Sequence, residues 1–167
     1  MTGGRRSLSA GVLLWRRTGP TVEVLAVHPG GPLWARRDDG AWSIPKGEIG
    51  PDEDPLAAAR REFAEEVGSP APDGEPMPLG EVRLKSGKRV LAWALEGDLD
   101  ADAIVSNSFE MQWPPRSGRM QAFPEVDRGA WLDPTRARVK LNPAQAAFVD
   151  RLLDMLDGST EHGSDAQ

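Results

Sequence analysis

Residues 43–69 read SIPKGEIGPDEDPLAAARREFAEEVGS, and this stretch decides how the rest of the chain is interpreted. Asp54 and Pro55 are a favourable N-cap and first-turn pair, and the alanines and charged residues that follow are good helix formers. Gly68 is a typical residue for ending a helix. The stretch therefore predicts a helix over residues 55–67, preceded by a loop rich in glycine and proline.

Three glutamates lie on one side of this predicted helix. At about 100° per residue, Glu62, Glu65 and Glu66 fall within one arc of about 100°, and the apolar Phe63 and Val67 occupy the adjoining arc. The helix dipole is negative at this end, so the three carboxylates repel one another unless a cation relieves them. Mg²⁺ and Mn²⁺ prefer carboxylate oxygens combined with water and phosphate oxygens. The pattern indicates a divalent-metal site, with a solvated acidic face as the alternative.

Composition limits what the whole chain can do. Its 167 residues fit one domain, which we place at residues 1–157, followed by a disordered tail at residues 158–167. The formal charge of -6 argues against binding nucleic acid through a basic face. The absence of cysteine excludes thiolate chemistry and fits a cytoplasmic location. No apolar run is long enough to span a membrane, so no membrane partner is expected.

Other parts of the chain predict a sheet around this helix. Strands are predicted at residues 9–17, 22–28, 42–44, 79–85, 89–98 and 125–132, the first two joined as a hairpin. A second helix is predicted at residues 144–156, after Asn142 and Pro143. Residues 100–124 carry Pro114, Pro115 and Gly118 and are expected to form a long irregular excursion.

The spacing of residues 47–69 resembles the Nudix box, G-x5-E-x7-R-E-U-x-E-E-x-G-U, where U is a bulky apolar residue. The residues that match it are Gly47, Glu53, Arg61, Glu62, Phe63, Glu65, Glu66 and Gly68. Ser69 departs from the pattern at a position that packs and carries no chemistry. The resemblance implies an α/β fold, a Nudix-type α/β/α sandwich with a mixed β-sheet. It also implies that the chain is a Nudix hydrolase, an enzyme that acts on acid anhydrides in phosphorus-containing compounds.

The resemblance also assigns roles to residues of the box. Glu62 and Glu66 would be the leading metal ligands, Glu65 would bind directly or through water, and the Gly47 carbonyl would add a further ligand. The ion would be Mg²⁺, with Mn²⁺ as a substitute, and the same glutamates would be catalytic. Glu53 and Arg61 would brace the loop against the helix, because an arginine can hold a carboxylate through two parallel hydrogen bonds.

Hydrolysis also needs a carboxylate that takes a proton from the attacking water. In some members of the family a glutamate of the box serves as this base, and in others the base comes from a later loop. Glu110 and Glu125 are the candidates outside the box, and both could instead be surface acids.

Substrate contacts are expected on both sides of the box. Lys46 precedes Gly47 in a W-x-x-P-K-G junction, and its ammonium can meet a phosphate oxygen. Arg36 could extend this anion site, and the indoles of Trp34 and Trp42 could stack on a base, although packing in the core is the alternative for each indole.

Taken together, the residues and the resemblance predict a Mg-dependent pyrophosphohydrolase. The expected substrate is a small molecule, a nucleoside triphosphate or dinucleoside polyphosphate. The alternative is a catalytically silent Nudix-fold module that binds a nucleotide or a protein. A homodimer stays open, because relatives dimerise but no feature of this sequence demands it.

Overall fold

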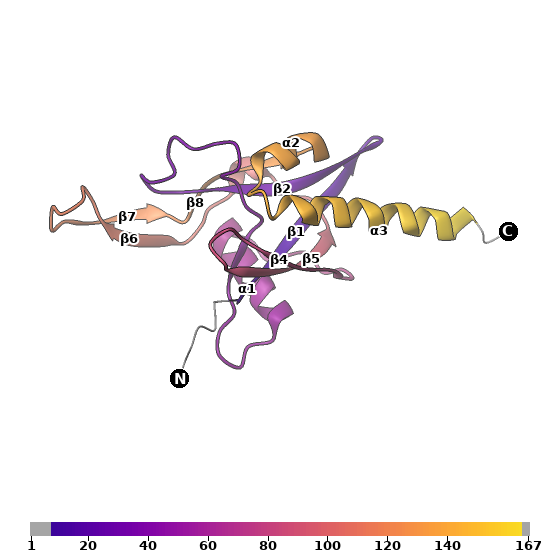
Figure 1. The fold of residues 1–167 in the computed structure, drawn as a ribbon, viewed down its shortest axis with the longest axis horizontal. Coiled ribbons are helices and arrows are strands. Elements are labelled where there is room, and N and C mark those ends of the chain that lie inside the picture. The colour runs from indigo at the N-terminus through magenta and orange to yellow at the C-terminus, as the bar shows by residue number, and fades with distance from the viewer. Residues whose placement is uncertain (1–7, 165–167) are drawn as a thin grey trace.

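A mixed sheet forms the middle layer of the computed structural model, which describes residues 8–164 and the side chains of residues 8–158 (Figure 1). Its strands run in the order β4, β5, β1, β2, β8, and β3 also pairs with β1. Their bounds are Leu8–Thr18 for β1, Thr21–Pro29 for β2, Lys46–Glu48 for β3, Met77–Arg83 for β4, Arg89–Glu96 for β5 and Val126–Leu132 for β8. β1 and β5 are parallel and the other pairs are antiparallel.

Helices cover both faces of this sheet. Alternate residues of β1 point to opposite faces, so Val12 and Leu14 pack with Phe63 of α1 (Pro55–Val67). Leu13 packs on the other face with Phe148 of α3 (Ala146–Ser164), next to α2 (Pro134–Lys140). The result is the predicted α/β/α sandwich with a mixed sheet. No helix in the described part of the chain is long and apolar enough to cross a membrane.

The helix of the box forms as its sequence predicts. The Asp54 carboxylate accepts a hydrogen bond from the Ala57 amide over 3.0 Å, so it caps the first turn. Gly68 has a φ of 88°, in the left-handed region that favours glycine, and ends the helix. The hairpin of β1 and β2 and the strand β8 also confirm their predictions.

The region of residues 100–124 differs from the expected irregular excursion. A 3-10 turn (Ala101–Ala103) is followed by an antiparallel hairpin of β6 (Ser108–Gln112) and β7 (Met120–Pro124), which projects from the sandwich (Figure 1). The prolines and Gly118 lie in its turn rather than in its strands. Their clustering therefore marked the tip of a hairpin, and the short strands on either side were missed.

Three smaller differences concern element boundaries. Within the predicted strand at residues 42–44, Trp42 and Ser43 make isolated bridges, and the strand in this region is β3 at Lys46–Glu48. α2 was not predicted, although Asp133 and Pro134 are a cap and first-turn pair like those of α1. α3 continues to Ser164 and so includes residues 158–164 of the expected tail, while residues 165–167 lie outside the described part of the chain.

Candidate active site

β3, which leads into the loop before α1, approaches that helix very closely. β3 pairs with β1 so that Gly47 lies opposite Ala10. A Cβ atom at Gly47 would overlap the carboxylate of Glu62. Glycine is required here because a side chain would occupy the space that the carboxylate fills. The backbone at Gly47 and the Glu62 carboxylate are thus held next to each other.

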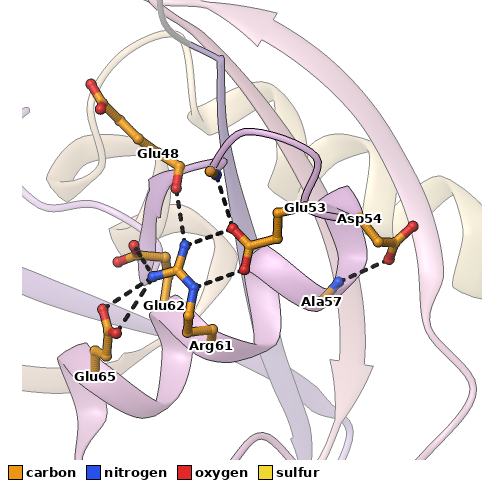
Figure 2. A network of polar contacts seen from close by, with 8 residues as sticks. Glu48, Glu53, Asp54, Ala57, Arg61, Glu62 and Glu65 are labelled. Carbon is orange, nitrogen blue, oxygen red and sulfur yellow. Dashed lines mark hydrogen bonds and ion pairs between the residues drawn. The ribbon is translucent and has the colours of Figure 1, made fainter.

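Arg61 joins this loop to the helix (Figure 2). Its Nε donates to Oε2 of Glu53 over 2.8 Å and its Nη2 to Oε1 over 2.9 Å. Nη2 also donates to the Glu48 carbonyl oxygen over 3.1 Å. The Arg61 guanidinium, helped by the Gly50 amide, lowers the pKa of Glu53 to about 2. The pair is therefore ionised at neutral pH and braces the loop against the helix.

The same guanidinium faces the acidic side of α1. Its Nη1 donates to Oε1 of Glu62 over 2.8 Å and lies 3.4 Å from both carboxylate oxygens of Glu65. Figure 2 shows the Glu62 and Glu65 carboxylates turned toward this one nitrogen. Arg61 therefore offsets part of the repulsion between two of the three glutamates of the box.

Glu66 lies toward β3 instead. Its Oε2 accepts a hydrogen bond from the backbone amide of Lys46 over 3.1 Å. Burial, together with the charges of Glu62 and Glu125 and against the charge of Lys46, raises the pKa of Glu66 to about 8. A carboxyl group in this environment keeps a proton at neutral pH until a cation approaches.

A fourth acid, Glu125, reaches the same place from a distant part of the chain. The Asn107 amide donates to the Glu65 carbonyl oxygen over 2.9 Å, and the Glu125 amide donates to the Asn107 carbonyl oxygen over 2.8 Å. The Gly30 amide in turn donates to the Glu125 carbonyl oxygen over 2.9 Å. Burial raises the pKa of Glu125, and the charges of Glu62 and Glu65 add to this effect. These bonds hold Glu125 between α1 and β2, beside the acidic cluster.

Glu110, the other acid predicted outside the box, lies elsewhere. It stands on β6 between Phe109 and Met111, two residues that line a cavity next to Glu66. Side chains alternate along a strand, so Glu110 projects from the opposite face, and it is exposed. The structure does not bring Glu110 into the carboxylate cluster.

The cavity has a volume of about 300 Å³ and opens beside the acids. Glu66 and Glu125 form its acidic end. Its apolar walls include four side chains, those of Leu33, Trp34, Phe109 and Met111. Of these four, sequence reasoning found only Trp34. The alternation of apolar residues in the short run FEM was the signal that could have identified two of the others.

The residues predicted to bind substrate are divided between the cavity and other places. Trp34 is 37% exposed and lines the cavity. Trp42 is only 6% exposed and its Nε1 donates to Asp38 over 2.8 Å, so it belongs to the core and offers no free face. Lys46 is half-buried beside the acids. Arg36 is exposed on the loop before Trp42 and is not part of the cavity lining.

The donor set fits a hard divalent cation. The carboxylates of Glu62, Glu65 and Glu66 and the carbonyl of Gly47 supply oxygen atoms, the ligands that Mg²⁺ and Mn²⁺ favour. Burial, together with the negative charges of Glu62 and Glu125, raises the pKa of Glu66, and a bound cation would favour its ionised form. Among the described side chains, no three acids or histidines already surround one point as they would surround an ion. Glu62 and Glu65 instead form ion pairs with Arg61.

Sequence comparison identifies a family and a set of relatives. A model of the NUDIX domain matches residues 5–152. An RNA pyrophosphohydrolase of Pseudomonas putida is 45% identical over 58 residues, which are 34% of this chain and 36% of that protein. An RNA pyrophosphohydrolase of Pseudomonas fluorescens is 47% identical over 51 residues, which are 29% of this chain and 32% of that protein. The chain thus spans about a third of the length of the curated relatives that it matches.

Solved structures resemble the whole sandwich. An Ap4A hydrolase of C. elegans, in a binary complex, has a TM-score of 0.61 at 18% identity, with 90% of this chain and 98% of that chain covered. The NUDIX domain of Shewanella oneidensis NrtR, complexed with ADP ribose, has a TM-score of 0.61 at 14% identity, with 92% and 90% covered. At these identities the likeness establishes the fold alone.

Proposed function

We propose that this chain, which belongs to the Nudix family, is a hydrolase of the pyrophosphohydrolase type that cleaves a phosphoanhydride bond in a nucleoside triphosphate or a dinucleoside polyphosphate. We propose Mg²⁺ as the metal ion, with Mn²⁺ able to substitute. The observation that carries this proposal is a single cavity with two acids at one end and an apolar lining along its walls.

The shape of the cavity favours a nucleotide over other phosphoanhydrides. Trp34 and Phe109 offer aromatic side chains, and Met111 is a soft apolar side chain that adapts to a flat ring. A base can pack against these walls while its polyphosphate reaches Glu66 and the metal ligands. A substrate that carries phosphates around its whole ring would need basic side chains on those walls, where the lining is apolar.

Residues of the box would hold the metal ion and the polyphosphate. Glu62, Glu65 and Glu66, with the Gly47 carbonyl, would hold the ion, and Arg61 would keep the first two carboxylates in position. When bound, a divalent cation neutralises phosphate charge and lowers the pKa of an attacking water. Lys46, beside these acids, would meet a phosphate oxygen with its ammonium group.

Glu125 is the general base that the geometry supports best. It lies at the acidic end of the cavity, and its raised pKa suits a group that must accept a proton near neutral pH. Glu110 is the competing candidate from the sequence, but it is exposed on the far face of β6. Glu125→Gln and Glu110→Gln therefore make a matched pair, and a rate loss confined to Glu110→Gln would reject this choice of base.

A panel of substrates tests the proposal. ATP, diadenosine tetraphosphate, ADP-ribose and a 5′-triphosphorylated RNA are incubated with Mg²⁺, and released phosphate, pyrophosphate and nucleotides are measured. The RNA is included because the Pseudomonas relatives are RNA pyrophosphohydrolases. Turnover that is fastest on ATP or diadenosine tetraphosphate would support the proposal. Turnover confined to the RNA would show that the proposed substrate class is wrong.

Variants of the box connect turnover to the metal ligands. Glu66→Gln should lower kcat/KM by at least about 100-fold, a typical loss when a key electrostatic group of a site is removed. Glu48→Gln is the matched control, because Glu48 is exposed and its carboxylate points away from Arg61 in Figure 2. Equal turnover by wild type and Glu66→Gln would reject the metal assignment. Nucleotide binding without turnover at any metal concentration would favour a catalytically silent module.

A cytoplasmic location is part of this proposal and rests on the cysteine-free composition. Cell fractionation tests it, and recovery with membranes or in the culture medium would contradict it.

A further inference from the structure

His28 is a buried histidine that the proposed reaction does not use. Its side chain on β2 is fully buried, and its ring meets the ring of Trp42 edge-on at 5.2 Å between centroids. Its Nδ1 lies 2.9 Å from Oδ1 of Asp127, and its Nε2 lies 2.6 Å from the backbone carbonyl oxygen of Arg37. Both ring nitrogens therefore face oxygen atoms.

These two oxygens determine how many protons the ring needs. A backbone carbonyl and an ionised carboxylate can only accept hydrogen bonds. A neutral imidazole has one N–H group, so it could donate to one oxygen and would turn its lone pair toward the other. A doubly protonated ring donates to both, and Asp127 then lies in contact as its counter-ion.

The surroundings bring Asp127 to the ring. His28 pairs with Arg128 and Pro29 pairs with Val126, so the register shifts and Asp127 lies between the two pairs. Other charges lie one contact further away. Arg128 stacks over the ring of Trp42 at 5.3 Å, Asp38 accepts a hydrogen bond from the Trp42 indole, and Lys140 forms an ion pair with Asp38.

The contact with Arg37 ties down one wall of the cavity. The Trp34 amide donates to the Gly31 carbonyl oxygen over 3.3 Å, and the Arg37 amide donates to the Trp34 carbonyl oxygen over 3.0 Å. The Arg37 guanidinium lies 5.4 Å from the centre of the Trp34 ring. His28 holds the last carbonyl of this series, so it fixes the end of the segment that carries Leu33 and Trp34.

We propose that His28 is a positioning residue, doubly protonated in the folded protein and paired with Asp127, that ties the Leu33–Trp34 wall of the cavity to the sheet. This inference rests on the proposed function only in taking the cavity as the nucleoside site. The ring protons and the order of the wall are measured on the protein without substrate, so the two can fail separately.

The number of ring protons is the first test. Nitrogen NMR of the imidazole is recorded at about pH 7.5, where an ordinary histidine is mostly neutral. A His162→Gln background leaves His28 as the one remaining histidine. Wild-type His28 should show protons on both nitrogens. Asp127→Asn should show one, on Nε2, because the new amide can donate to Nδ1 and a neutral ring then satisfies both contacts. One ring proton in the parent, or two in Asp127→Asn, would overturn the proposal.

The tie to the wall is the second test. His28→Phe keeps a ring but has no donor, so exchange of the Arg37 amide hydrogen should become roughly 10-fold faster, as expected when a hydrogen bond to a charged group is lost. The Leu84 amide, bonded to the Lys88 carbonyl oxygen on another hairpin, is the internal reference. Asp127→Asn should leave Arg37 as protected as in wild type. Unchanged exchange in His28→Phe would overturn the positioning role, and if that variant does not fold, the ring protons of the other two proteins still decide.

Discussion

Replacing Glu66 by glutamine should make the metal-free protein more stable at alkaline pH. The pKa of Glu66 is raised from an ordinary value of 4.5 to about 8. A carboxyl whose pKa is raised on folding weakens the folded state as pH rises between these two values, because the unfolded chain releases the proton first. At 1.36 kcal/mol per pKa unit, the full effect above pH 8 is about 5 kcal/mol. The glutamine amide has two N–H donors in a site built for a carboxylate, and leaving a donor without a partner costs stability. This cost reduces the expected net gain to about 3 kcal/mol.

Urea unfolding in EDTA measures this gain, with the fluorescence of the six tryptophans as the signal. The free energy of unfolding of Glu66→Gln should be slightly lower than that of wild type at about pH 5 and should rise above it progressively up to about pH 8. Glu48→Gln removes a charge from the same segment without entering the cluster, so it should follow wild type at both pH values. A difference between Glu66→Gln and wild type that does not change with pH would refute the reasoning, as would a less stable variant at pH 8.

Three further predictions concern the loop, the cavity and the base. Gly47→Ala should lower kcat/KM at least about 100-fold, because the new methyl group displaces the Glu62 carboxylate. Gly158→Ala, in open space on α3, should leave the rate unchanged. Equal rates for the two variants would contradict the close approach at Gly47. Trp34→Ala should raise KM roughly 10-fold with little effect on kcat, as expected for lost base stacking, and an unchanged KM in steady-state assays would exclude that contact. Glu125 must lose its proton to act as base, and its pKa is raised, so the acidic limb of the pH–rate profile should lie at a higher pH than for an ordinary glutamate. Glu125→Gln should lose this acidic limb. If the limb persists in Glu125→Gln, it belongs to another group.

Local rules were enough to predict α1. The cap at Asp54 and the stop at Gly68 depend on residues within one helical turn, and both occur as expected. The pairing of Arg61 with Glu53 was implied by the resemblance to the Nudix box, and the structure shows it within a single loop and helix. Prediction succeeded here because each partner is close in sequence.

The remaining features depend on contacts between distant segments. Glu125 joins the cluster through bonds that pass from Glu65 to Asn107 and on to Gly30, and no local pattern encodes that path. Trp42 is withdrawn into the core because His28 and Asp38 occupy its edges, although its position beside the box suggested a base-stacking role. Both outcomes are set by tertiary packing.

Within the part of the chain that the structure describes, β6 and β7 pair with each other and not with the large sheet, yet their hairpin supplies Phe109 and Met111 to the cavity. Substitutions along residues 108–124 can therefore reshape what the cavity accepts while the acids on α1 keep their places. The residues that select the substrate and the carboxylates that act on it therefore lie on different elements. Related proteins could acquire different substrates through substitutions in this one hairpin.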